Sequence, residues 1–197
     1  AKLLRSWGRS SSLFDIDSEK IENRFNIKID KIQYDKKFVF EELGYNFEPS
    51  ELGSAFGLIQ LKKLNININK RIKIFKSHTN FLSKFKDYFE TPMQYENIKT
   101  GWLAYPITVK PNKYFNRTDL QIFLEKNNIQ TRVVFTGNIL RQPAFKNIKC
   151  FKKQSYKYAD KVMKNSLLIA CHHGLSLKEI RYIYLIINKF FKYKKIY

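Results

Sequence analysis

The spacing of apolar residues changes near Trp102, and this change limits the possible fold more than any other feature of the sequence. Before it, apolar residues recur at intervals of three and four, as on one face of an α-helix. The clearest such run is Leu52, Ala55, Phe56 and Ile59. After it, strand-length apolar segments alternate with helical ones as far as residue 191. This pattern predicts an α/β protein in which helices precede a small domain that contains a sheet.

The helical part is expected to begin at Pro49, since proline is favoured in the first turn of a helix. Gly53 and Gly57 lie four residues apart in it, and glycine costs about 1 kcal/mol inside a helix. Close approach of another backbone would explain both. The Asn-rich stretch 64–69 is expected to break the pattern before a second, basic helix. Residues 7–37 show little periodicity and are predicted to form a long irregular loop, which in compact proteins is often functional.

The later segment is predicted to hold three strands and three helices. The strands are expected at residues 102–109, 129–135 and 167–171, and the helices after Thr118, near residues 156–164 and after Ser176. Thr118 with Gln121, and Ser176 with Glu179, have the spacing of a capping box. Pro106 falls inside the first strand, which tolerates it only at an edge or a bulge.

The chain carries a formal net charge of +20, and the whole excess lies in its later part. Residues 1–62 hold ten basic and ten acidic side chains, whereas residues 63–197 hold 27 basic and seven acidic ones. Such an excess is typical of proteins that bind nucleic acid or an anionic surface. However, Lys, Ile and Asn make up about a third of the chain, a bias that an AT-rich genome imposes on exposed positions, and the basic residues are dispersed. A nucleic-acid partner is therefore the less favoured alternative, and a phosphorylated small substrate fits either origin.

Cysteine usage and hydropathy indicate a reducing compartment. Cys150 and Cys171 are too few for a disulfide framework, and we expect inert or buried thiols. No apolar run approaches the roughly 18 residues that span a bilayer, and no signal-peptide pattern is present. We expect no membrane span and a cytoplasmic protein.

Most catalytic signatures are absent from the sequence. It contains no Walker loop, no GxGxxG, no HExxH and no GxSxG. His172 and His173 follow a predicted strand, but adjacent residues there point to opposite sides, so a shared metal is not expected. No metal site is predicted.

Two segments are less easily explained as scaffold. In the first, Asn46 stands ahead of the Pro49 helix, where its amide could meet an anion near a helix N-terminus or simply cap the turn. In the second, Arg132 is followed by Asn138 and Arg141 on a strand end and its loop. Arginine binds phosphate through two parallel hydrogen bonds, so a diphosphate would fit there. A surface ion pair is the alternative.

At these segments the sequence resembles the DegT/DnrJ/EryC1/StrS family of sugar-nucleotide aminotransferases and dehydratases. The matching stretches, in the family's order, are residues 4–9 (LRSWGR), 44–47 (GYNF), 55–61 (AFGLIQL), 129–132 (IQTR), 141–143 (RQP) and 173–176 (HGLS). The run Gly-Asn-x-x-Arg-Gln-Pro at residues 137–143 is closest to the branch that removes the C3 hydroxyl of CDP- or GDP-4-keto-6-deoxyhexoses.

The resemblance implies the C-terminal portion of a fold type I PLP-dependent transferase. Residues 1–87 would be the end of the PLP-binding large domain, with the active-site loop and connecting helices. Residues 88–197 would be the small C-terminal α/β domain, with a short, mainly antiparallel sheet. The implied enzyme is a homodimer with shared active sites that uses pyridoxal 5′-phosphate (PLP) or pyridoxamine 5′-phosphate (PMP).

The resemblance also suggests roles for individual residues. Asn46 corresponds to the asparagine that reaches across the dimer to the cofactor phosphate of the other subunit. The positions that line the sugar-nucleotide pocket correspond to Arg132, Asn138 and Arg141. Trp7 and Arg9 would lie on the loop that borders the active site.

The chain departs from the family pattern in two ways. The family's Schiff-base lysine, or the histidine that replaces it in dehydratases, lies just upstream of residues 4–9, so we expect no catalytic residue in this chain and no activity from it alone. One dehydratase subgroup carries cysteines after that stretch to hold a [2Fe–2S] cluster. Here residues 10–14 read SSSLF, so no iron–sulfur cluster is expected.

The function implied by the resemblance is 3-dehydration or amination of a nucleotide-linked 4-keto-6-deoxy sugar for surface polysaccharide or lipopolysaccharide. Two alternatives stay open at this point. One is a basic nucleic-acid-binding module, and the other is a non-catalytic truncated remnant that serves only as a dimerisation piece.

Overall fold

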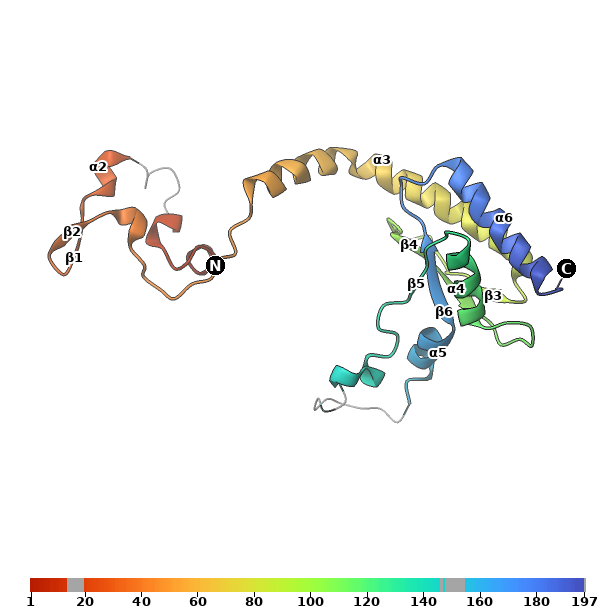
Figure 1. Ribbon diagram of the computed structural model, residues 1–197. Coiled ribbons are helices and arrows are strands. Elements are labelled where there is room, and N and C mark those ends of the chain that lie inside the picture. The colour runs from red at the N-terminus through yellow and green to blue at the C-terminus, as the bar shows by residue number, and fades with distance from the viewer. Residues whose placement is uncertain (14–19, 146, 148–154, 197) are drawn as a thin grey trace. The chain divides into compact units, whose positions relative to one another are not determined.

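The structure is a computed structural model that describes residues 1–13, 20–145, 147 and 155–196 (Figure 1). The chain forms two compact units, residues 1–62 and residues 63–197, and the boundary falls inside helix α3 (Glu51–Leu82). The predicted domain division at residue 87 refers to a longer protein and stays a prediction.

The first unit depends on two backbone stretches that are distant in the sequence and lie side by side. Its helices and strands are α1 (Lys2–Arg5), α2 (Ile21–Arg24), β1 (Ile27–Ile29), β2 (Ile32–Tyr34) and the first turns of α3. Residues 3–10 run beside residues 39–48. The amide of Trp7 donates to the carbonyl of Tyr45 over 2.9 Å, and the Tyr45 amide donates to the carbonyl of Leu4 over 2.7 Å. These hydrogen bonds give the backbone amides and carbonyls of the two stretches partners within the chain.

Two glycines allow this close approach of the backbones. Gly8 has a φ of +79°, which glycine adopts far more easily than other residues, and a Cβ there would overlap the carbonyl of Glu42. A Cβ at Gly44 would overlap the backbone of Trp7 and Gly8. Neither position therefore has room for a side chain.

The prediction of an irregular loop over residues 7–37 is wrong for much of that segment. β1 and β2 form an antiparallel hairpin whose turn residues, Asp30 and Lys31, both have positive φ, as a tight two-residue turn requires. The Arg24 guanidinium bonds both carboxylate oxygens of Asp35, at 2.9 and 2.8 Å from Nε. The short pairing and the ion pair give this segment local structure without an apolar period.

The predicted break at residues 64–69 is also wrong, because α3 is continuous from Glu51 to Leu82. Asparagine is only weakly unfavourable in a helix, and isoleucines alternate with the asparagines in this stretch. The close backbone approach expected at Gly53 and Gly57 is not found within the described residues, where a Cβ at Gly57 would meet nothing within 4 Å.

The second unit contains a four-stranded sheet with helices packed on it. Its elements are the later turns of α3, β3 (Phe89–Glu90), β4 (Ala104–Val109), α4 (Arg117–Lys126), β5 (Arg132–Val133), α5 (Lys157–Asn165), β6 (Ser166–Ala170) and α6 (Leu177–Tyr193). The strand order is β3-β4-β6-β5, and every neighbouring pair is antiparallel. The predicted α/β class and antiparallel sheet are confirmed. The predicted three strands are corrected to four, and β5 is shorter than expected.

Pro106 lies in β4, an inner strand, yet its position resembles an edge. On one side it stands opposite Leu168 of β6. On the other side β3 pairs only with Thr108 and Val109, so in the described chain no strand faces Pro106 there. The missing amide hydrogen of proline thus disturbs little pairing.

The helix caps are partly as predicted. α6 begins after Ser176, whose amide and hydroxyl both donate to the carboxylate of Glu179 over 2.7 Å. α4 is capped by Asn116 and Asp119 rather than by Thr118 and Gln121. The capping box is thus formed by a neighbouring pair with the same spacing of three residues.

The core lies between the sheet and a layer of helices. Alternate residues of β4 are buried, and α3 and α6 run side by side along the sheet (Figure 1). Phe81 of α3 stacks on Tyr184 of α6 with ring centres 4.1 Å apart. The most enclosed side chains include Leu82, Tyr105, Ile107, Leu120, Leu124, Leu167, Ile169, Ile186, Ile187, Phe190 and Phe191.

His78 is a polar residue buried within this core. His78 of α3 has no exposed surface, and its Nε2 donates to the carbonyl of Ala170 over 3.0 Å. Burial favours the neutral ring, whose Nδ1 then accepts from the Tyr184 hydroxyl over 3.0 Å. Burial lowers the pKa of His78 and raises the pKa of Tyr184 to about 12.

The described part of the chain bears on three further expectations. None of its helices combines the length and apolar content needed to cross a bilayer, and none of its residues form a group of three or more His, Cys, Asp and Glu suited to a metal. Cys171 is a buried free thiol, and burial raises its pKa to about 11, as expected for an inert cysteine. Cys150 lies outside the described residues.

We expect the fold to weaken in mild acid because of His78. Its pKa is lowered by folding, so the unfolded chain takes up a proton near pH 6.5 while the folded chain does not. Between about pH 7 and about pH 5 the free energy of unfolding should therefore fall, by at most about 1.4 kcal/mol per pH unit. Urea unfolding across this range measures the slope. His78→Gln, which keeps one donor and one acceptor, should flatten it, and equal slopes in both proteins would contradict this account.

Gly44→Ala should destabilise the first unit, because a methyl group there has no room beside Gly8. We expect a loss on the order of 2 kcal/mol, seen as faster amide hydrogen exchange at Trp7 and Tyr45. Gly57→Ala is the matched control, since its Cβ enters open space within a helix and should stabilise α3 by roughly 1 kcal/mol. Equal exchange rates in the two variants would contradict the packing described for Gly44.

Candidate functional site

Three of the residues expected at an active site come together in the first unit. An isolated antiparallel bridge places Asn46 opposite Ser6, the residue before Trp7. The Arg9 guanidinium lies over the Trp7 ring, 4.6 Å from its centre, in a cation–π contact. The backbone pairing thus places the Trp7–Arg9 pair and Asn46 on two neighbouring segments of the chain.

The side chain of Asn46 is exposed and has no hydrogen-bond partner within the part of the chain that the structure describes. Its backbone is nevertheless fixed by pairing, since the neighbouring Tyr45 and Phe47 amides donate to Leu4 and Arg5 over 2.7 and 2.9 Å. A primary amide offers two donors to an anion. The backbone at Asn46 is therefore fixed, while its side-chain amide is free to bind a ligand.

Asn138 and Arg141 meet at one carboxylate in the second unit. The amide nitrogen of Asn138 donates to Oδ1 of Asp160 over 2.7 Å. Arg141 donates from Nη2 to Oδ2 of Asp160 over 2.6 Å, and its Nε bonds the other oxygen, Oδ1. Asp160 lies in the first turns of α5, whereas its two partners lie on the loop after β5.

This arrangement shifts the pKa values of the two charged side chains in the cluster. The hydrogen bonds from Arg141, and then from Asn138, lower the pKa of Asp160 to about 2. The same carboxylate raises the pKa of Arg141. Asp160 is thus ionised at every physiological pH, and both partners of the ion pair stay charged.

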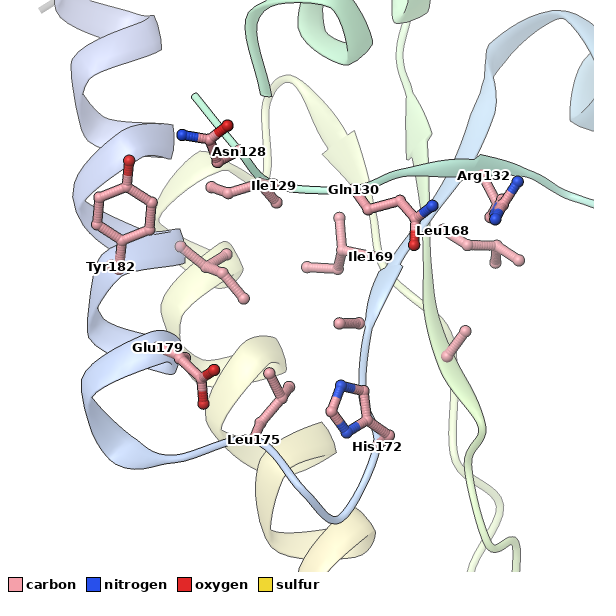
Figure 2. A pocket seen from close by; sticks show the side chains of 13 residues that line it. Asn128, Ile129, Gln130, Arg132, Leu168, Ile169, His172, Leu175, Glu179 and Tyr182 are labelled. Carbon is pink, nitrogen blue, oxygen red and sulfur yellow. The ribbon is translucent and has the colours of Figure 1, made fainter. Parts of the chain in front are cut away.

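Arg132 lies apart from this cluster and borders a cavity of about 380 Å³ beside β6 (Figure 2). The cavity lies on the side of residues 128–130, just before β5 begins, since β5 pairs only with Leu167 and Leu168 of β6. Its lining is Ala104, Asn128, Ile129, Gln130, Arg132, Leu168, Ile169, Ala170, His172, Leu175, Glu179, Tyr182 and Ile183. The carboxylate of Glu179 is held by the α6 cap. The lining is mostly apolar, and both the Arg132 guanidinium and the Glu179 carboxylate border it, so the cavity suits a largely apolar or planar body.

The structure therefore groups the predicted residues in three places. Trp7, Arg9 and Asn46 lie together in the first unit, Asn138 and Arg141 share one partner in the second, and Arg132 borders the cavity. Asn138 is buried, and its Oδ1 accepts from the Leu140 amide over 3.1 Å, so it caps the loop as well.

Sequence reasoning did not identify Asp160. It contacts residues 19 and 22 positions away, and no local motif includes it. The scarcity of acidic residues was a usable signal, since residues 63–197 hold only seven acidic side chains. One of these few, in the first turn of a predicted helix after an arginine-bearing loop, was a candidate partner for that arginine.

Comparison with known proteins gives consistent matches. The sequence is 29% identical over 189 residues to the lipopolysaccharide biosynthesis protein RfbH of Salmonella typhimurium, covering 95% of this chain and 43% of that protein. It is 30% identical over 142 residues to a UDP-4-amino-4,6-dideoxy-N-acetyl-beta-L-altrosamine transaminase of Campylobacter jejuni, covering 72% of this chain and 37% of that protein.

A solved structure agrees with these relatives. The crystal structure of GDP-4-keto-6-deoxymannose-3-dehydratase with a trapped PLP-glutamate geminal diamine matches with a TM-score of 0.63 and 30% identity, over 77% of this chain and 39% of that one. The fold is thus that of the C-terminal part of such PLP-dependent enzymes, as predicted.

The chain spans about two-fifths of the length of the curated relatives it matches. The model of the DegT/DnrJ/EryC1/StrS aminotransferase family, in contrast, covers most of this chain, from residue 16 to residue 188. The chain therefore belongs to the DegT/DnrJ/EryC1/StrS aminotransferase family.

Proposed function

We propose that this chain is the C-terminal part of a PLP- or PMP-dependent enzyme that acts on a nucleotide-linked 4-keto-6-deoxy sugar. Its product would feed the synthesis of surface polysaccharide or lipopolysaccharide. The names of the relatives support the substrate class, since they include a GDP-4-keto-6-deoxymannose 3-dehydratase and a UDP-sugar transaminase. The observation that carries the proposal is the free amide of Asn46 on a backbone held by pairing.

The chemistry of Asn46 fits a cofactor phosphate. Its amide donates hydrogen bonds and adds no charge, and it is not used by another described side chain. In the enzyme that we propose, a homodimer, Asn46 would donate to the phosphate held mainly by the partner subunit. Trp7 and Arg9 would border the same active site.

The second unit would supply groups for the nucleotide-sugar. The outer edge of the Arg141 guanidinium and the second amide hydrogen of Asn138 would donate to phosphate oxygens. Arg132 would add a further positive charge near the cavity beside β6. These residues bind and orient the substrate and do not themselves transfer protons.

PLP or PMP, when bound, supplies an electron sink for reaction at carbons near the sugar ketone. The protein residue over the cofactor decides the outcome: lysine would direct transamination and histidine would direct removal of the C3 hydroxyl. In the family pattern this residue lies upstream of Leu4. The run from Gly137 to Pro143 resembles that of the dehydratase branch.

The surface of α3 supports the proposal that the chain functions within a larger protein. Apolar side chains project from its first turns in several directions, with Leu52 85%, Phe56 67% and Leu61 64% exposed. A helix that is apolar on all sides is normally buried. Further polypeptide, of the kind that the longer relatives have, would cover this surface.

Asn46→Ala in the complete enzyme should weaken PLP binding about tenfold, because it removes one hydrogen bond to a charged group. Equilibrium dialysis followed by visible absorbance measures the retained cofactor. Asn65→Ala changes another exposed asparagine, in α3, and should leave PLP affinity unchanged.

Two results would count against the proposal. Equal PLP affinity in Asn46→Ala and the parent would refute the role of Asn46. Absence of cofactor absorbance from the complete parent protein would instead favour the truncated, non-catalytic remnant.

A further inference from the structure

We propose that Asp160 is a positioning residue that holds Arg141 and Asn138 in the orientation that receives the diphosphate of the nucleotide-linked sugar. This inference rests on the proposed function, because it assigns a purpose to residues placed there at the substrate. It adds a residue that touches neither cofactor nor sugar and acts through two others.

The first argument is the side of the guanidinium that Asp160 occupies. The two carboxylate oxygens take the edge formed by Nε and one Nη2 hydrogen of Arg141. The hydrogens of Nη1 and the second one of Nη2 lie on the other edge of the planar group. Since the Arg141 side chain is 61% exposed, this outer edge is accessible to an anion while the inner edge is fixed.

The second argument is the orientation of Asn138. Its Oδ1 accepts from the Leu140 amide, so its amide nitrogen must face the other way, toward Oδ1 of Asp160. Asn138 is only 7% exposed, and the carboxylate defines which way its amide points. One carboxylate oxygen thus accepts from both residues and fixes the distance between their donors.

The third argument is that α5 holds the loop at a second point. A Cβ added at Gly137 would overlap the side chain of Met163, so the loop backbone lies directly on α5 there. Met163 follows Asp160 by three residues and shares its helix face. Two adjacent contacts on one helix therefore hold the start of the loop that carries Asn138 and Arg141.

An opposite role for Asp160 predicts an effect of opposite sign. If the carboxylate merely competed with phosphate for Arg141, its removal would tighten anion binding. We favour positioning, because a free arginine loses much rotamer entropy when it binds, whereas Arg141 is already held with one edge open. The direction of the affinity change therefore separates the two roles.

The test uses the complete enzyme, with GDP and UDP as probes. ¹⁵N NMR follows the Arg141 Nε–Hε signal while each nucleotide is added. In the parent enzyme this signal should be sharp, since its hydrogen is bonded to Asp160, and it should move on titration. Asp160→Asn should broaden the signal and raise the Kd for the better probe about tenfold.

Matched variants separate positioning from folding. Glu90→Gln breaks the ion pair that the next residue of α5, Lys161, makes over 2.7 Å, and should change neither signal nor Kd. Should Asp160→Asn not fold, Arg141→Lys keeps the charge but loses the fork, and should weaken binding by a similar factor. In the double variant, which combines Asp160→Asn with Arg141→Lys, the two losses of nucleotide affinity should not add.

The outcomes distinguish this inference from the proposed function. If the parent binds nucleotide and Asp160→Asn binds equally well or more tightly, positioning by Asp160 is refuted and the proposed function stands. If neither nucleotide moves the Arg141 signal of the parent enzyme, the substrate role of Arg141 fails, and the inference fails with it.

Discussion

The antiparallel pairing of β4 with β6 is the contact on which the second unit depends. It turns Tyr105 and Ile107 toward the helices that enclose the core, and it leaves β6 with a short partner on its other side. α5 runs directly into β6 with no residue between them, so the sheet also fixes where α5 lies. Through this connection the sheet places Asp160 beside the loop that carries Arg141.

The two candidate clusters hold their asparagines in different ways. In the first unit, paired backbones hold Asn46 and leave its side chain free. In the second, Asn138 is buried and committed to a carboxylate and a loop amide. The free amide of Asn46 can offer both of its hydrogens to a group from outside the chain, whereas the committed amide of Asn138 has one hydrogen left for such a group.

Much of the second unit could be predicted because its signals are local. The apolar period and the Ser176–Glu179 cap predict α6, and a short apolar run predicts β6. Each of these signals comes from residues close together in the sequence. β3 was missed because two residues carry no period. The continuity of α3 was missed because a weak propensity was taken for a stop signal. In the site, the loop motif identified Arg141 and Asn138, but Asp160 meets them only through the fold.

The central claim is that this chain completes an enzyme for nucleotide-linked 4-keto-6-deoxy sugars. The most direct measurement is mass spectrometry of the sugar after the complete gene product is incubated with PLP, an amino donor and a GDP- or UDP-linked 4-keto-6-deoxyhexose. The account predicts a sugar that has lost its C3 hydroxyl or has gained an amine in place of the ketone oxygen. Recovery of the unchanged substrate, from a protein that folds and binds the cofactor, would contradict it.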